Sequence, residues 1–112
     1  LWTYPLDSAD NISADGTSAF NHSVAMDNHD NALVVWEQVD NIDSISGRTQ
    51  IFMSEYRHGS WNNPDSLTDN ISLDGKFANY PEVAMDDDWN AIIVWSQQES
   101  NNIQQLFKSE YR

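Results

Sequence analysis

The sequence predicts an all-β chain built from two tandem copies of one repeat, and three observations support this prediction. First, the 112-residue chain repeats one pattern of residues, in a first copy over about residues 1–58 and in a second over about residues 60–112. Second, the apolar runs of both copies are short and rich in β-branched and aromatic residues, as strands are. Third, clusters of Asp, Asn and Gly separate these runs, and such clusters favour turns.

The repeat rests on three blocks of sequence that return in the same order. They are residues 10–13 with 69–72, residues 24–27 with 83–86, and residues 54–57 with 109–112. The loop before the third block is about four residues shorter in the second copy. Because a match of this length and order does not arise by chance, we expect both copies to adopt one fold within a single domain of ordinary size.

Each copy is predicted to form a hairpin followed by further strands. In the first copy the strands are expected over residues 23–26, 32–36 and 50–53, and an Asx-rich turn over residues 27–31 joins the first two. Residues 86–90 form the equivalent turn. The runs 32–36 and 91–95 are almost continuously apolar, which is typical of a strand covered on both faces.

A fourth short strand is predicted over residues 60–64, and its equivalent in the other copy is residues 1–5. Four short strands per repeat, covered on both faces, are typical of a blade of a β-propeller. The chain thus opens with the last strand of a blade and ends after a third strand. We therefore predict a unit of two four-stranded blades over residues 1–112, in which residues 1–5 supply the outer strand of a neighbouring chain's blade.

Two blades alone leave apolar faces and strand edges open, so self-association into a closed ring is predicted. Three chains giving six blades are the first choice, since propellers hold typically four to eight. Four chains, or a longer polypeptide of which this chain is a piece, remain open. The start at Leu1 without a Met favours an extracellular or periplasmic protein from which a leader was removed, or a fragment.

The charge of the chain narrows its partners. Eighteen acidic residues against five basic ones give a formal net charge of -13, which repels nucleic acids and anionic membrane surfaces. No apolar run approaches the roughly 20 residues that span a bilayer. Neutral sugars and cationic ligands remain open, and no sequence motif indicates a cofactor.

Residues 81–86, followed by residues 90–95, resemble the repeat of bacterial sialidase-like β-propellers. In those repeats a P-x-V-A-x-D strand turns into an N-A-x-x-V-W strand, and the resemblance covers both copies. It implies a fold and not an activity. His22 replaces the proline in the first copy, residues 13–18 and 72–77 only approximate the Asp-box of sialidases, and the chain has three arginines. We therefore predict turns between blades at these segments and no sialidase activity.

The two-blade organisation is also similar to that of small bacterial and fungal sugar-binding lectins that trimerise into six blades. Those lectins hold a sugar between blades with Arg, Glu and Trp, which implies a sugar at the blade junctions here. A structural ion pair explains a Glu and an Arg two positions apart on a strand equally well. The candidate ligand-binding residues are the repeated Glu and Arg positions and the aromatics expected at strand ends or turns: Trp2, Glu55, Arg57, Trp61, Tyr80, Trp89, Glu110 and Arg112.

Structural roles are the simpler explanation for two other groups of residues. Trp36 and Trp95 lie inside expected strands and are predicted to be core residues. A calcium site is one interpretation of the carboxylates of Asp86, Asp87 and Asp88. The EF-hand spacing is absent, however, so a solvated hairpin turn is favoured. No metal site is predicted. The sequence thus favours a non-catalytic ligand-binding module of the β-propeller type, with carbohydrate at the blade junctions as the candidate ligand. The alternatives are a structural or protein-interaction fragment of a larger exported propeller protein and, third, a glycoside hydrolase.

Overall fold

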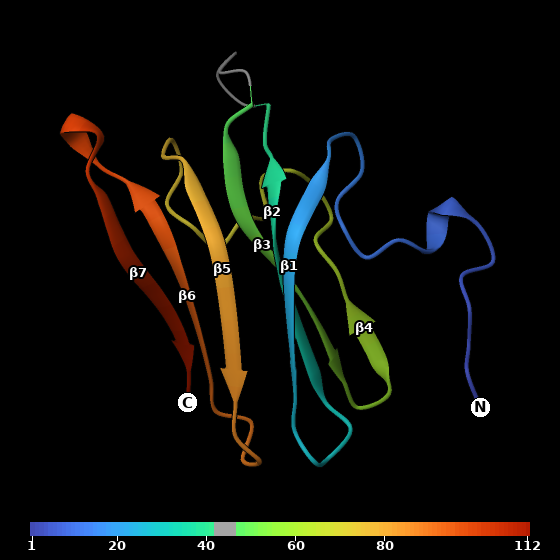
Figure 1. Cartoon of the computed structure of the whole chain (residues 1–112). Helices are drawn as coiled ribbons and strands as arrows, with labels where there is room; N and C mark the ends of the chain where they lie inside the picture. The colour runs from blue at the N-terminus through green and yellow to red at the C-terminus, as the bar shows by residue number, and fades with distance from the viewer. Residues whose placement is uncertain (42–46) are drawn as a thin grey trace.

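Two antiparallel β-sheets lie side by side in the computed structural model, which describes residues 1–41 and 47–112 (Figure 1). The first sheet has the strand order β1-β2-β3-β4 and the second β5-β6-β7. The strands are β1 (Ala19–Met26), β2 (Ala32–Val39), β3 (Thr49–Arg57), β4 (Ser60–Asn62), β5 (Ala78–Met85), β6 (Ala91–Gln98) and β7 (Gln104–Tyr111). The only helical turns in these ranges are two 3-10 turns, η1 (Ser8–Asp10) and η2 (Ser100–Asn102). The all-β prediction is confirmed, and one chain by itself is not a closed propeller.

The two copies of the repeat share one backbone geometry. Val24 pairs with Val34 across β1 and β2, and Val83 pairs with Ile93 across β5 and β6. Each first strand also carries a bulge at the same place, between Phe20 and Ser23 in β1 and between Asn79 and Glu82 in β5. The residue inside each bulge has a left-handed backbone, with φ of 54° at Asn21 and 57° at Tyr80. The sequence repeat is therefore a structural repeat.

An apolar core holds the two sheets together. Val35 and Ile51 of the first sheet pack against Ala78, Ile93 and Trp95 of the second, and all five are buried. On the other face of the first sheet, the rings of Trp36 and Phe52 stack with their centroids 6.5 Å apart. The prediction that Trp36 and Trp95 are core residues is confirmed.

A buried carboxylate on β2 connects β1 with β5, the first strands of the two sheets. Glu37 on β2 is 2% exposed, and its Oε2 accepts hydrogen bonds from Asn21 Nδ2 at 2.8 Å and from the backbone N of Tyr80 at 2.9 Å. Its Oε1 accepts a third from Asn79 Nδ2 at 3.0 Å. Asn79 also donates to Thr49 Oγ1 on β3. Because a buried charge is costly without partners, this network favours one placement of β5 against the first sheet.

The second sheet differs from the prediction on its outer face. β2 is covered on both faces as expected, but β6 is covered on one face only. Ile92 and the neighbouring Leu106 of β7 are exposed, Leu106 by 80%. The physical reason is that the first sheet lies over one face of the second sheet, and none of the described residues lies over the other. Residues 91–95 are thus apolar even on the face of β6 that no other sheet covers within one chain.

The predicted strand over residues 1–5 does not form within one chain. Leu1, Trp2 and Tyr4 are exposed, and the N-terminal segment extends beside the first sheet on the side opposite β7 (Figure 1). The second sheet has three strands, and its fourth strand is the one that the sequence analysis expects from a neighbouring chain. Within the described part of the chain no helix is long and apolar enough to cross a bilayer.

Replacing Glu37 should weaken the contact between the sheets. Glu37→Ala leaves three N–H donors near the core without their acceptor, and we expect it to lower the free energy of unfolding by about 2–4 kcal/mol. Ser96→Ala, at the equivalent position of the second repeat, is the matched control and should change it by less than about 0.5 kcal/mol. Urea unfolding followed by circular dichroism measures both, and equal losses would contradict the role given to Glu37.

Candidate functional site

A cavity of about 150 Å³ lies between the two sheets, at the end where the hairpin turns are. Its lining combines apolar side chains with carboxylate and hydroxyl groups: Leu33, Met53, Glu55, Trp89, Ala91, Ile93, Ser109, Glu110 and Tyr111. β3 of the first sheet contributes Glu55, and the second sheet contributes the aromatic residues. The cavity therefore lies at the junction between the repeats, where the sequence predicted a ligand site.

The turn between β5 and β6 positions Trp89 at this cavity. Oδ1 of Asp86 accepts hydrogen bonds from the backbone N of Asp88 and of Asn90, both at 2.9 Å, and its Oδ2 accepts one from Asn90 Nδ2. Trp89 adopts the left-handed backbone, with a φ of 64°, that this turn requires. Asp27 makes the same contacts with Asn31 in the first repeat. The Asx-rich turns predicted from the sequence are confirmed.

These hydrogen bonds lower the pKa of Asp86 below its ordinary value of 3.8, first through the side chain of Asn90 and then through the backbone N of the same residue. At Asp27 burial acts against ionisation, but the hydrogen bonds from Asn31 and His29 outweigh it, so that pKa is lowered too. Both turns are therefore held by an ionised carboxylate at neutral pH.

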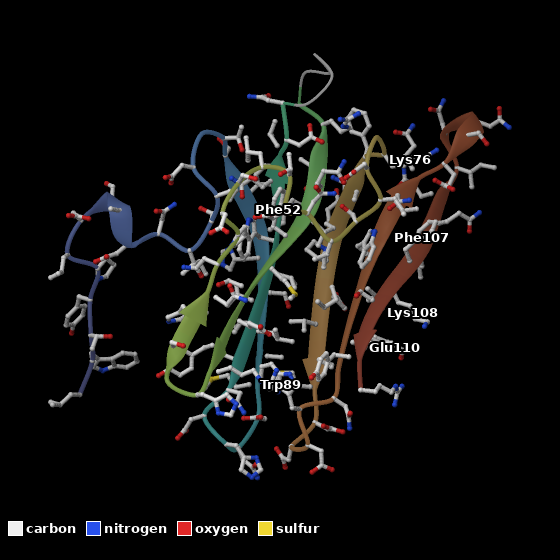
Figure 2. The ribbon with its side chains drawn as sticks, turned by 180° about the vertical axis from the view of Figure 1, so that it is seen from behind. Phe52, Lys76, Trp89, Phe107, Lys108 and Glu110 are labelled. Carbon is white, nitrogen blue, oxygen red and sulfur yellow. The ribbon has the colours of Figure 1, made fainter. Side chains whose placement is uncertain are left out.

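Trp89 is 8% exposed, although the sequence placed it among partly exposed aromatics. It is buried because the first sheet covers it: the guanidinium carbon of Arg57 lies 4.2 Å from the centroid of its ring. The same guanidinium lies 5.5 Å from the ring centroid of Tyr111. A cation over two aromatic rings is attracted by their electron-rich faces. Figure 2 shows Trp89 near this end of the molecule, between the two sheets.

Glu110 and Arg112 lie on β7 and its end, but their charged groups belong to the outer face of the second sheet. Glu110 pairs with the exposed Ile92, and residues opposite each other in a sheet share a face. Its carboxylate accepts hydrogen bonds from Lys108 Nζ at 3.0 Å and Arg112 Nη2 at 3.1 Å. These two partners, Lys108 first, lower the pKa of Glu110. Lys108 and Glu110 follow each other along β7 in Figure 2.

The remaining candidate residues lie away from the cavity. Trp61 on β4 packs against Tyr56, with ring centroids 5.3 Å apart, and alternation places this pair on the opposite face of β3 from Glu55 and Arg57. Tyr80 lies exposed at the bulge of β5, and Trp2 lies in the exposed N-terminal segment.

Of the eight residues predicted for the site, Glu55, Trp89 and Glu110 line the cavity, and Arg57 lies against the ring of Trp89. Reasoning from the sequence missed Tyr111, which lies between two predicted residues. The alternation of side chains along a strand was the signal that could have found it, because it places Tyr111 on the face opposite Glu110 and Arg112.

The described residues contain no group of three His, Asp or Glu side chains that could hold a metal ion. In comparisons with known proteins, the chain matches no protein-family model, no curated protein and no solved structure. The chemistry of the cavity is therefore argued from its own lining, which holds two glutamates, one serine, two aromatic rings and apolar side chains, with the guanidinium of Arg57 against the two rings. Such a set can accept hydrogen bonds from hydroxyl or amino groups and contact apolar ligand surface.

The acid sensitivity of the turn that carries Trp89 can be tested. Because the pKa of Asp86 is lower in the folded chain than its ordinary value of 3.8, its charge stabilises the fold above that value. This contribution is lost as the pH falls below 3.8 towards the folded-state pKa. We expect Asp86→Asn to reduce stability at neutral pH and to flatten its decline over that acidic range, as measured by melting temperature across a pH series.

Asp88→Asn is the matched control for this measurement. It removes a charge from the same turn, but among the described contacts its carboxylate accepts none of the hydrogen bonds that hold the turn. The same loss of stability in both variants would show that net charge, and not the hydrogen bonds of Asp86, governs the acid response.

Proposed function

We propose that the chain is a non-catalytic β-propeller module that binds a small hydroxylated ligand, with a carbohydrate as the first candidate, at the junction between its blades. The observation that carries the proposal is the convergence of Glu55, Trp89 and Tyr111 at a cavity between the two repeats, with the guanidinium of Arg57 against both rings. These residues come from both sheets, so the junction itself creates the site.

Several features support the assignment of the two sheets as propeller blades. The first three strands of both repeats have the same order, and both repeats have the same bulge in the first strand and the same hairpin turn. β5 lies against the first sheet, as inner strands of neighbouring blades do. In this proposal other copies of the chain complete the ring.

The chemistry of the cavity favours a neutral ligand that carries hydroxyl groups. The carboxylate of Glu55 can accept hydrogen bonds from two hydroxyls, and Leu33 and Met53 offer apolar surface to the C–H groups of a sugar. The formal net charge of -13 disfavours anionic ligands. At about 150 Å³ the cavity is smaller than the roughly 300–1,000 Å³ of typical ligand pockets, so we assign it one sugar unit or the end of a longer glycan.

A second candidate function is that of a structural or protein-interaction fragment of a larger exported propeller protein. The exposed apolar residues of the outer face of the second sheet, Ile92 and Leu106, favour it. The two functions are compatible, because the cavity lies between the sheets and this face lies outside them. A glycoside hydrolase is the third candidate, and its test is turnover that disappears when one carboxylate is neutralised.

Ligand binding should be visible in the fluorescence of the chain. Titration with a panel of neutral monosaccharides and short glycans should give a saturable change in Trp emission, because Trp89 lines the cavity. We expect Glu55→Gln to weaken the affinity about tenfold or more, since it removes a charged hydrogen-bond acceptor. Isothermal titration calorimetry provides the second measurement.

Two variants serve as controls. Glu82→Gln removes an exposed carboxylate from β5 that does not line the cavity, and it should leave the affinity unchanged. Trp61→Phe should preserve the fluorescence change, whereas Trp89→Phe should abolish it. Absence of any response to the whole panel, or an equal effect of Glu55→Gln and Glu82→Gln, would remove the support for a sugar site at this cavity.

A further inference from the structure

We propose that a second copy of this chain docks against the outer face of the second sheet, using the outer face of its own first sheet. In this arrangement the contact between two chains repeats, position by position, the contact between the two sheets within one chain. The inference rests on the propeller assembly proposed above and adds the residues that form the contact. We call the contact within one chain the internal contact and the proposed one the external contact.

A short segment before β5 anchors the internal contact to β3. The hydroxyl of Ser72 accepts a hydrogen bond from the backbone N of Ile51 at 2.9 Å and donates one to Oε1 of Gln50. The backbone N of Ile71 donates to the backbone O of Ile51 at 2.8 Å. Ile51 is fully buried as a result.

The same chemistry is present at the equivalent positions that form the external contact. The segment before β1 offers Ile12 and Ser13, which are identical to Ile71 and Ser72. β7 offers Gln105 and Leu106, which stand where β3 has Gln50 and Ile51. Within one chain these groups do not meet, and Leu106 is 80% exposed where Ile51 is 0% exposed. A second copy brings them together and re-forms the three hydrogen bonds.

The outer face of the first sheet is hollowed to receive this second copy. A cavity of about 310 Å³ there is lined in part by Ile12, Ala19, Val34 and Trp36. Their equivalents in the second repeat form the side of the internal core that covers Val35 and Ile51: Ile71, Ala78, Ile93 and Trp95. The surface around this cavity therefore corresponds to the surface of the second sheet that packs against the first sheet.

Two pairs of residues differ between the internal and the external contact. The guanidinium of Arg57 meets Trp89 in the internal contact, and the equivalent residues of the external contact are Arg112 and the exposed Asp30. A cation–π pair is thus replaced by an ion pair. The carboxylate of Glu37 meets Asn79 internally, and Ser96 meets Phe20 externally. The external contact thus lacks both the carboxylate of Glu37 and the amide of Asn79 that donates to it, so neither group is left without the other.

The N-terminal segment fits the same arrangement. In the first sheet Trp61 of β4 pairs with Tyr56 of β3, and their equivalents are Trp2 and Tyr111. The N-terminal end of the chain, which includes Trp2, lies beside the first sheet, on the opposite side of the molecule from β7 (Figure 1). Trp2 therefore reaches the Tyr111 of another copy and not its own, and residues 1–3 become the fourth strand of that copy's second sheet.

The external contact joins two different faces, so each copy retains one free face after docking. Such head-to-tail contacts close into a ring when the rotation per copy allows it. Because the external contact repeats the internal one, each sheet is related to the next by the same rotation, as in a propeller. We expect three copies, which gives six blades.

The experiment measures the solution mass of the chain over a concentration series, by light scattering after size exclusion and by sedimentation. We expect a species near three copies. Leu106→Glu places a charge in the centre of the external contact and should weaken association about tenfold or more. Leu6→Glu is the matched control, because its equivalent Asp65 is already acidic and exposed while the internal contact is intact; this variant should associate normally.

A charge exchange tests the pairing of Arg112 with Asp30. Arg112→Asp alone and Asp30→Lys alone place like charges opposite each other and should both weaken association. The double variant restores opposite charges and should recover most of the loss. Circular dichroism of all three variants establishes that the fold is retained.

The results separate this inference from the ligand-binding proposal. A chain that stays monomeric at all concentrations overturns the external contact and leaves further repeats of a longer polypeptide as the occupant of these faces. Association that is unchanged by Leu106→Glu, or that the charge exchange does not restore, overturns it as well. The ligand cavity lies within one chain, so the monomeric Leu106→Glu variant still responds to sugar if the ligand site is right.

Discussion

The arrangement of the chain depends on the buried carboxylate of Glu37. A charge in the interior is stable only when hydrogen-bond donors surround it, and here the donors come from Asn21 in the first sheet and from Asn79 and Tyr80 in the second. Two of them lie at the bulges of the inner strands, which turn their N–H groups toward the carboxylate. The carboxylate therefore aligns β5 with the first sheet, in an arrangement where the apolar core and Trp89 lie between the two sheets.

The two repeats have the same backbone but different surroundings, and this difference explains why equivalent residues differ in their exposure to solvent. Ile51 is buried by the second sheet, whereas its equivalent Leu106 is exposed. Ala78 is buried by the first sheet, whereas its equivalent Ala19 is exposed. A residue's burial thus depends on whether a neighbouring sheet lies over it and not on its own strand. Apolar residues that cluster on an uncovered face are typical of interaction surfaces.

The candidate ligand site could be predicted in part. Glu55 and Arg57 were identified because they return in the second repeat, and their place on one face follows from the alternation of side chains in a strand. The same rule places the side chain of Glu110 on the outer face of the second sheet, so the repeated Glu lies between the sheets in one copy and on an exposed face in the other. The contact of Arg57 with Trp89 could not be predicted, because the two residues lie in different sheets and only the packing of the sheets brings them together.

The sequence by itself determined the features that depend on local interactions. These are the two repeats, the strands from their short apolar runs, and the turns at Asp27 and Asp86, where short polar side chains satisfy nearby backbone groups. The burial of Trp89 and the exposure of Leu106 were decided only by the tertiary structure. The physical reason is that burial requires a second surface, and strand periodicity specifies which side chains share a face but not what covers that face.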